Sequence, residues 1–221
     1  MSIYFSNSVK NMTNYKPVHS PSIKQRNEHF LKLFQKYLTR EVFGERREKT
    51  MAIDIGCGGA PELATFGHYL AMIGWSHKVK IVGIDIDYEV TLTARDLLRI
   101  TDDRLTGADI VHKIISGNAI KLYSELVRAG VIEDKETFDL ALMRHPHVLK
   151  IPKVYEKILA ELYHCVKPNA PLMITCYYEA EVERMIEIIK REGSFKVLTK
   201  EQYNDRTTEG DSYIIIAKAI G

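Results

Sequence analysis

Met51-Ala-Ile-Asp54-Ile-Gly56-Cys57-Gly58-Gly59-Ala60 is the stretch that decides the fold, because an apolar run leads directly into a glycine-rich turn. The run from Met51 to Ile55 predicts a buried strand. Glycine at positions 56, 58 and 59 allows positive φ and a close approach of the backbone to a bound group. Asp54 can accept hydrogen bonds from a cationic or hydroxylated group. Together these features indicate an α/β fold with a nucleotide site at the end of a strand.

The turn discriminates between two kinds of nucleotide site. The dinucleotide fingerprint G-x-G-x-x-G/A needs a small residue at its sixth position, where the helix packs on the strand, and Pro61 occupies that position. An NAD site is therefore disfavoured. The pattern D-x-G-x-G-x-[GA] fits without strain on Asp54, Gly56, Gly58 and Ala60. It resembles motif I of the class I S-adenosylmethionine-dependent methyltransferases.

A second strand is predicted in Lys78-Val-Lys-Ile-Val-Gly-Ile-Asp85-Ile86-Asp87, and a helical pattern follows from Glu89 to Ile100. The resemblance places Asp85 at the ribose of S-adenosylmethionine, where its two oxygens accept from both hydroxyls. The resemblance also groups Ile86 and, in the glycine turn, Cys57 with the cofactor contacts. Asp87 suits a different role, the N-cap of the helix that follows.

A third strand is predicted over Val111 to Ser116, and Asn118 follows it. The family usually carries an acid there that accepts from the adenine amino group. An amide oxygen can accept the same bond, so Asn118 and its neighbour Ala119 are expected beside the adenine. Asn118 could instead cap a helix from Ala119 to Arg128.

The fourth predicted strand, Phe138 to Met143, ends in Arg144-His145-Pro146-His147 at the sheet edge where such folds place their chemistry. Methyl transfer requires in-line placement of a nucleophile and removal of its proton. His145 and His147 are the candidate bases, because imidazole titrates near neutral pH. Arg144 is grouped with the cofactor contacts and would also suit an anionic substrate.

The same turn argues against two other kinds of site. His145 and His147 alternate in an extended segment, so their side chains point apart, and no third ligand stands at a recognisable spacing. We therefore predict no metal site. The turn also lacks the N/D-P-P-Y/F sequence of the family members that methylate amino groups of nucleobases or glutamine, which disfavours that class. A structured RNA or a protein stays open as acceptor, but no added RNA-binding domain is recognisable, so a small molecule is the first expectation.

Strands and helices continue to alternate up to the C-terminus, which calls for a parallel sheet covered on both faces. The resemblance implies a Rossmann-like three-layer α/β sandwich with a seven-stranded, mostly parallel sheet whose last strand is antiparallel. The remaining predicted elements are helices over 64–75, 153–166 and 179–192 and strands over 171–177, 194–198 and 212–219.

The N-terminal residues 1–47 are predicted to form an extension, either a lid or a packing element, to the S-adenosylmethionine-binding methyltransferase-like domain at 48–221. A helix is predicted from Ile23 to Phe43, with an apolar stripe that packs on the core. Residues 14–21 could line a substrate pocket. No acidic residue occurs from Met1 to Asn27, where lysines and arginine alternate with aromatic residues, so this segment could contact RNA.

Composition limits the classes of protein that fit. The chain has 221 residues with 31 Lys and Arg against 29 Asp and Glu, a balance that argues against a protein built chiefly to hold nucleic acid. The three cysteines have neither disulfide nor zinc spacing, which suits a reducing compartment. No leader and no membrane-length apolar run is apparent, so we expect a cytoplasmic protein that contacts no membrane. The sequence does not indicate an oligomeric state.

These patterns predict an enzyme that transfers the methyl group of S-adenosylmethionine to an acceptor, most simply a small molecule. Two alternatives stay open at this point. The chain could transfer the aminocarboxypropyl arm of the same cofactor, or it could be a methyltransferase-like scaffold without catalysis.

Overall fold

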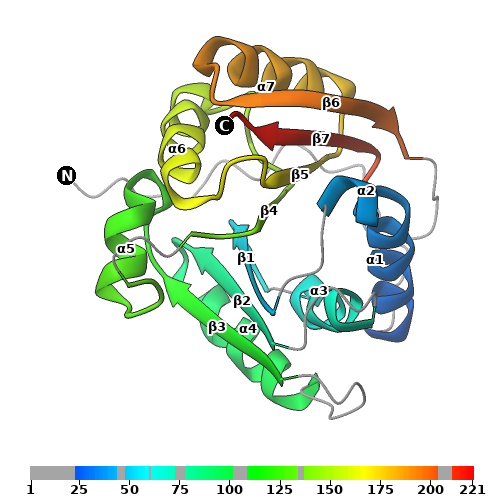
Figure 1. Cartoon of the computed structure of the whole chain (residues 1–221), viewed down its shortest axis with the longest axis vertical. Helices are drawn as coiled ribbons and strands as arrows, with labels where there is room; N and C mark the ends of the chain where they lie inside the picture. The colour runs from blue at the N-terminus through cyan, green and yellow to red at the C-terminus, as the bar shows by residue number, and fades with distance from the viewer. Residues whose placement is uncertain are drawn as a thin grey trace, which may run out of the picture.

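The structure is a computed structural model that describes residues 23–43, 48–59, 61–72, 78–101, 109–133, 137–203 and 211–221. Within these ranges seven strands form one sheet in the order β3-β2-β1-β4-β5-β7-β6 (Figure 1). The strands are β1 (Lys49–Ile55), β2 (Lys78–Asp85), β3 (Asp109–Ser116), β4 (Leu140–Arg144), β5 (Pro171–Cys176), β6 (Phe195–Gln202) and β7 (Tyr213–Ala219).

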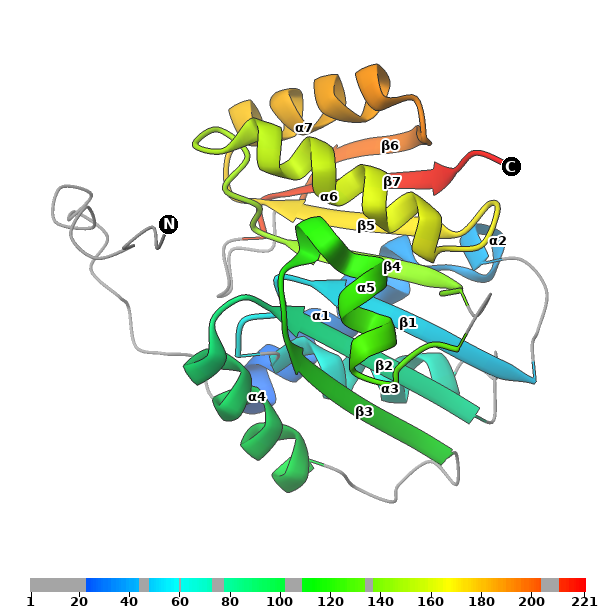
Figure 2. The ribbon, with the colours of Figure 1, turned by 90° about the vertical axis from the view of Figure 1, so that its left-hand side faces the viewer.

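Helices cover both faces of the sheet, as the alternation of elements predicts. One core joins the sheet to α5, α6 and α7, and a second joins it to α1, α3 and α4. Figure 2 shows α5 and α6 in front of the strands and α1 and α3 behind them. The helices are α1 (Ile23–Tyr37), α2 (Arg40–Phe43), α3 (Pro61–Met72), α4 (Tyr88–Thr101), α5 (Leu122–Arg128), α6 (Pro152–Cys165) and α7 (Glu179–Glu192), and the 3-10 turn η1 (Ala119–Lys121) precedes α5.

The predicted fold class is confirmed by the pairing of the strands. Strands β1 to β5 pair in parallel, whereas β7 lies between β5 and β6 and is antiparallel to both. The chain leaves β1 toward β2 and β3 on one side and returns to β4 and β5 on the other. The strand order therefore reverses between β1 and β4, and ligands of open α/β sheets bind at the carboxyl ends of the strands at such a point.

Strand β1 is buried on both faces, which explains its nearly continuous apolar sequence. Met51, Ile53 and Ile55 contribute to the core under α5, α6 and α7, while Ala52 contributes to the opposite core. Because side chains alternate along a strand, Asp54 lies on the same face as Ala52, toward α1 and α3.

The N-terminal helix packs as its apolar stripe predicts but ends earlier than expected. The prediction of one helix over Ile23–Phe43 is wrong, because α1 stops at Tyr37 and α2 starts at Arg40. The Tyr69 hydroxyl donates to the Leu38 carbonyl oxygen (2.7 Å), which a continuous helix would pair with the Val42 amide. The Val42 amide donates to the Thr39 carbonyl instead. The buried stripe is Phe30, Leu33, Phe34, Tyr37 and Leu38.

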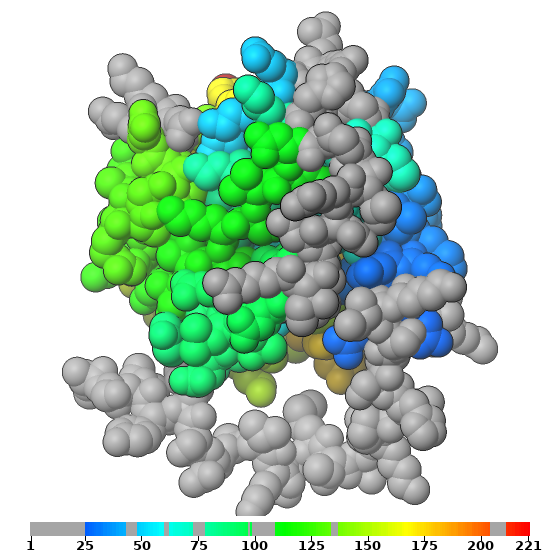
Figure 3. Space-filling view, turned by 90° about the horizontal axis from the view of Figure 1, so that it is seen from below, coloured from blue at the N-terminus to red at the C-terminus, as the bar shows by residue number. Residues whose placement is uncertain are grey.

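The sheet ends at β3 on one side. Figure 3 shows the molecule from below, with green residues on the left and the blue residues of α1 on the right. The predicted RNA contact and substrate-pocket segment fall on residues outside the described part of the chain.

None of the helices within the described ranges is long and apolar enough to cross a membrane.

Close packing under the glycine turn depends on Gly83 in β2. A Cβ atom at this position would lie 2.8 Å from Ile114 Cδ1, 2.9 Å from Cys57 Sγ and 3.0 Å from Leu63 Cδ1. These distances are shorter than normal contacts, so only glycine lets β3, the turn and α3 meet here without displacement.

We expect Gly83→Ala to lower the free energy of unfolding by about 1 to 3 kcal/mol, because the added methyl overpacks this core. Urea denaturation monitored by circular dichroism measures the change. Gly59→Ala is the matched control, since nothing lies within 4 Å of a Cβ built at Gly59, and it should stay within about 0.5 kcal/mol of the wild type. Equal stability of the two variants would contradict this account of Gly83.

Candidate functional site

Backbone hydrogen bonds hold the carboxyl ends of β1, β2 and β3 together. The amides of Gly56 and Cys57 donate to the Ile84 carbonyl oxygen at 2.8 and 3.2 Å, and the Gly117 amide donates to the Asp85 carbonyl oxygen at 2.8 Å. Gly56 and Gly58 have φ of 69° and 52°, and open space surrounds the position of a Cβ at each. The two glycines therefore adopt the positive φ that their sequence predicts, and among the described residues no atom fills the space beside them.

Asp85 fixes the second half of this turn. Its Oδ2 accepts from the Gly58 amide and its Oδ1 from the Asp87 amide, both at 2.9 Å. Each carboxylate oxygen keeps a further lone pair, so the side chain can still accept from two hydroxyl groups. Ile86, the next residue, is 74% exposed, which leaves an apolar surface beside the carboxylate.

The predicted N-cap role of Asp87 is confirmed. Its Oδ1 accepts from the amides of Glu89 and Val90, at 3.0 and 3.2 Å, in the first turn of α4. Asn118 is a cap as well, because its Oδ1 accepts from the Ile120 amide at 3.0 Å. The predicted helix from Ala119 starts as the 3-10 turn η1 and continues as α5. The Asn118 oxygen retains a second lone pair for another donor.

Cys57 lies in the turn but its thiol faces the protein. The residue is buried, and the short distance from Sγ to a Cβ built at Gly83 places the sulfur against β2. Burial raises the pKa of the thiol well above its ordinary range, with the carboxylates of Asp54 and Asp85 adding to the shift. The side chain is therefore a packing group and not a nucleophile.

Asp54 is a buried acid without a hydrogen-bond donor. Its exposed fraction is 0%, and within the described part of the chain neither carboxylate oxygen accepts a hydrogen bond. Burial raises the pKa of Asp54 well above its ordinary range, and the facing Glu62 raises it further, while Arg144 acts in the opposite direction. A buried carboxylate whose oxygens accept no hydrogen bond from the described residues is costly in the folded protein.

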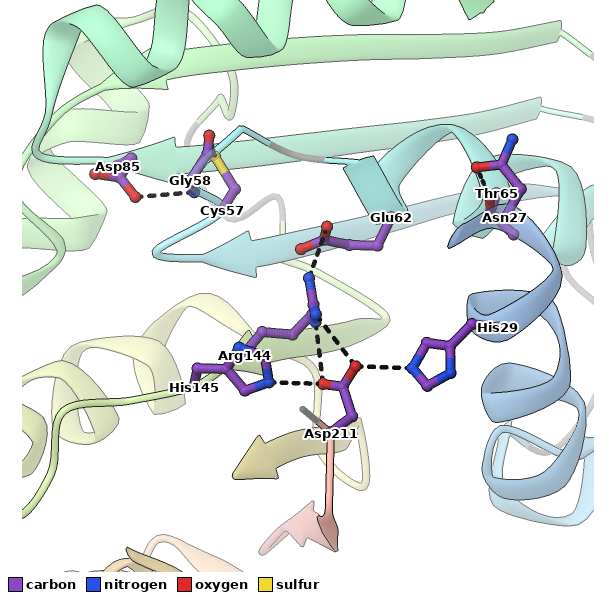
Figure 4. A network of polar contacts seen from close by, with 10 residues as sticks. All are labelled: Asn27, His29, Cys57, Gly58, Glu62, Thr65, Asp85, Arg144, His145 and Asp211. Atoms are coloured by element: carbon purple, nitrogen blue, oxygen red, sulfur yellow. Dashed lines mark hydrogen bonds and ion pairs between the residues drawn. The ribbon is translucent and has the colours of Figure 1, made fainter. Parts of the chain in front are cut away.

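Arg144 at the end of β4 is the centre of a buried ionic network (Figure 4). Its Nη1 donates to Glu62 Oε2 at 3.1 Å, and its Nη2 and Nε donate to Asp211 Oδ2 and Oδ1 at 3.1 and 3.3 Å. The guanidinium carbon lies 4.5 Å from the centre of the Phe30 ring of α1. Burial alone would lower the pKa of Arg144, but the two carboxylates raise it above its ordinary range.

Asp211 connects this network to two histidines. His29 Nε2 of α1 and His145 Nε2 each lie 2.9 Å from an Asp211 carboxylate oxygen. Burial acts to raise the pKa of Asp211, but Arg144 and the two histidines hold it well below its ordinary range. Asp211 within the network and Asp54 beside it are thus two buried acids with pKa shifts in opposite directions.

The two histidines predicted as bases have different surroundings. His145 adopts a positive φ of 48°, stacks on the Tyr177 ring with 3.7 Å between ring centres, and keeps 14% of its side chain exposed. His147 is exposed, and its backbone amide donates to the Tyr155 hydroxyl at 2.9 Å. His145 alone of the pair is therefore held in place by its side chain among the described residues.

Sequence reasoning did not identify Glu62, Asp211 or His29. Glu62 follows Pro61 at the start of α3, and proline at the first position of a helix is a signal that could have placed the helix start three residues earlier than predicted. No local pattern distinguishes Asp211 or His29. Among the residues that the structure describes, no group of three or more His, Cys, Asp and Glu is arranged as a metal site.

We expect Asp54→Asn to raise the free energy of unfolding of the ligand-free protein at pH 8 by about 1 kcal/mol or more. An acid whose pKa is raised by folding contributes stability below about pH 4, and that contribution is lost as the pH rises through the folded pKa. The asparagine avoids this loss. The difference between variant and wild type, measured by urea denaturation, should therefore shrink toward zero at pH 4, and a destabilised variant at pH 8 would contradict the assignment.

Asp211→Asn should have the opposite effect and lower the free energy of unfolding by about 3 kcal/mol near neutral pH, because Arg144 loses a buried partner. An acid whose pKa is lowered by folding stabilises the protein above about pH 4, and the contribution is lost as the pH falls through the folded pKa. The same denaturation series checks this. A deficit that does not diminish in acid would show that the carboxylate charge is not the cause.

Comparison with known proteins supports the fold assignment. No protein-family model and no curated protein sequence matches the chain. An rRNA methylase from Streptococcus thermophilus has a similar structure, with a TM-score of 0.54 and 14% identity over 81% of this chain and 92% of that chain. A SAM-dependent methyltransferase from Methanosarcina mazei gives a TM-score of 0.53 and 17% identity over 82% of this chain and 98% of that chain.

A third similar structure is the magnesium protoporphyrin IX methyltransferase from Synechocystis, solved with bound SAM. It has a TM-score of 0.55 and 10% identity, and the match covers 89% of this chain and 80% of that chain. Identities in this range bear on architecture rather than on substrates. Together with the strand order, they show that the chain has the Rossmann-like fold of the class I S-adenosylmethionine-dependent methyltransferases.

Proposed function

We propose that this protein binds S-adenosylmethionine and transfers its methyl group to a small-molecule acceptor. The observation that carries the proposal is the Asp54 carboxylate, fully buried at the end of β1 with no donor among the described residues. S-adenosylmethionine carries an ammonium group on its methionine part. That cation would supply both the hydrogen bonds and the charge that Asp54 lacks.

The other residues at this edge of the sheet match the remaining parts of the cofactor. Asp85 has two acceptor positions left for the ribose hydroxyls, and Ile86 offers an exposed apolar surface for one face of the adenine. Asn118 and Ala119 are assigned to the adenine edge. The open backbone at Gly56 and Gly58 suits the methionine part, while Cys57 contributes its position in the turn and not its thiol.

The bound cofactor would supply an electrophilic methyl group on a sulfonium, so the protein itself has to orient the acceptor and take its proton. His145 is our preferred base, because its Nε2 lies 2.9 Å from Asp211 Oδ1 and its ring stacks on the Tyr177 ring. This arrangement leaves Nδ1 to accept the proton. His147 is a weaker candidate, since its side chain is exposed and nothing in the described residues orients it.

Arg144 has a positioning role in this proposal. Both sides of its guanidinium already bind carboxylates, and its carbon packs over Phe30. A contact with the cofactor or with an anionic substrate would have to break one of these buried ion pairs, which is costly. We therefore favour an acceptor without a negative charge.

A scaffold without a ligand fits the site less well. A buried carboxylate that lacks a donor destabilises the folded chain and contributes nothing to a purely structural role. Transfer of the aminocarboxypropyl arm would use the same cofactor contacts, so analysis of the products distinguishes it from methyl transfer.

Asp85→Ala should weaken S-adenosylmethionine binding at least about tenfold, because a charged acceptor of two hydrogen bonds is lost. Isothermal titration calorimetry with S-adenosylmethionine, S-adenosylhomocysteine and NAD measures this, and the wild type should bind the first two and not NAD.

Asp87→Ala is the matched control, since this neighbouring acid caps α4. It should cost about 1 kcal/mol in stability and leave the affinity for the cofactor unchanged. Wild-type affinity in a folded Asp85→Ala protein would remove the ribose assignment. Failure of the wild type to bind either sulfur compound would overturn the proposed function.

A further inference from the structure

We infer that the acceptor is a neutral planar aromatic molecule with an O–H or N–H group, which stacks on Tyr177 and Tyr178 beside His145. The inference rests on the proposed function and specifies its substrate class. It is carried by the position of exposed aromatic side chains, by the contacts that hold them, and by the charges around them.

Exposed large apolar side chains gather where the parallel strands end. Ile86 and Tyr88 follow β2, Leu149 follows β4, and Tyr177 and Tyr178 follow β5. Because β1 separates β2 from β4 and β5, the first two belong to the cofactor side of the edge and the other three to the opposite side. An apolar rim of this kind is typical of a site for an apolar ligand.

Tyr177, Tyr178 and His145 form a connected set of rings. The His145 and Tyr177 rings stack at an angle of 26°, and the Tyr177 and Tyr178 ring centres are 6.1 Å apart. Tyr177 is 40% exposed and Tyr178 is 58% exposed, so both keep surface for a further ring. Offset or tilted contacts at such spacings favour aromatic partners over aliphatic ones.

The backbone that carries the two tyrosines is held by α7. Glu181 Oε2 accepts from the amides of both Tyr177 and Tyr178, at 3.0 and 3.2 Å, and the Glu181 residue is buried in the first turn of α7. His145 Nε2 lies 2.9 Å from Asp211 Oδ1, and the His145 backbone has a positive φ of 48°. A positive φ at a residue other than glycine is costly and is found preferentially at functional sites. The surface is therefore organised before an acceptor arrives.

The charges near the tyrosines favour a neutral aromatic acceptor over a nucleic acid. Glu179 follows Tyr178 directly, and its exposed carboxylate pairs with Lys200 Nζ at 3.5 Å. Arg144, which follows the last buried residue of β4, is already paired with two carboxylates. Because a polynucleotide needs cations for its phosphates and these two are paired within the protein, a neutral ring fits this surface better.

The reaction on such an acceptor balances without another reagent. The O–H or N–H proton passes to His145 Nδ1, and the heteroatom lone pair forms the bond to the methyl carbon. The carbon–sulfur bond breaks with its electron pair moving to sulfur. The sulfonium becomes the neutral thioether of S-adenosylhomocysteine, and the product is an aromatic methyl ether or N-methyl compound.

The test is a calorimetric titration of protein saturated with S-adenosylhomocysteine, first with 2-naphthol and then with its saturated counterpart decahydro-2-naphthol. We expect saturable binding of 2-naphthol and at least about tenfold weaker binding of the saturated alcohol. Tyr178→Ala should weaken 2-naphthol binding by about the same factor, whereas Tyr178→Phe, which keeps the ring, should retain it. Leu198→Ala, which removes an exposed apolar side chain from the distant strand β6, is the matched control and should bind as the wild type does.

Each other outcome overturns the inference. Equal affinity for the two alcohols, unchanged binding in Tyr178→Ala, or an equal loss in Leu198→Ala would show that the tyrosines do not select an aromatic ring. So would binding of a single-stranded uridine oligonucleotide through Tyr178 in place of 2-naphthol. Normal binding of S-adenosylhomocysteine without binding of 2-naphthol would refute the substrate class alone, while loss of both would refute the proposed function.

Discussion

The guanidinium of Arg144 is the interaction on which the rest of the site depends. It joins β4 to Glu62 at the start of α3 and to Asp211 just before β7, and it packs on Phe30 of α1. Removing one partner from such a buried set leaves an uncompensated charge, which costs far more than a surface ion pair contributes. The network therefore fixes four parts of the chain relative to one another at the point where the strand order reverses.

An acid beside this network has no hydrogen-bond donor among the described residues. The charge of Asp211 is stabilised by Arg144 and two histidines, whereas the charge of Asp54 is destabilised by burial and by the facing Glu62. A site that binds a cationic group has to keep an acceptor free for it, so stability is lost where binding is gained. This opposition explains why replacement of the two aspartates should change stability in opposite directions.

The glycine turn follows β1, and the Arg144 network begins at the end of the neighbouring strand β4. Gly83 in β2 allows the turn, α3 and β3 to pack closely, and this packing brings Glu62 within reach of Arg144. On the other side, Glu181 holds the tyrosines that follow β5 against His145. The residues that we assign to the cofactor and the aromatic surface thus lie on opposite sides of the buried Asp54 and Arg144, an arrangement that suits the proposed transfer between two molecules.

The sequence by itself determined the features that depend on local patterns. Apolar runs predicted the strands, the D-x-G-x-G turn predicted an open backbone at Gly56 and Gly58, and Asp87 was predicted as a cap, because each follows from the properties of residues close together in the chain. The break after Tyr37 could not be predicted, since it depends on a hydrogen bond from Tyr69.

Only the tertiary structure decided which charged residues meet. His29 and Asp211 are 182 positions apart and Arg144 and Asp211 are 67 apart, so no periodicity or motif connects them. Their pairing results from the fold of the sheet, in which only β5 lies between β4 and β7, and from the packing of α1 over Arg144. In this environment the pKa of Asp54 is raised and the pKa of Asp211 is lowered, although nothing in the sequence distinguishes the two aspartates. The reason is that burial disfavours a charge unless an opposite charge lies beside it.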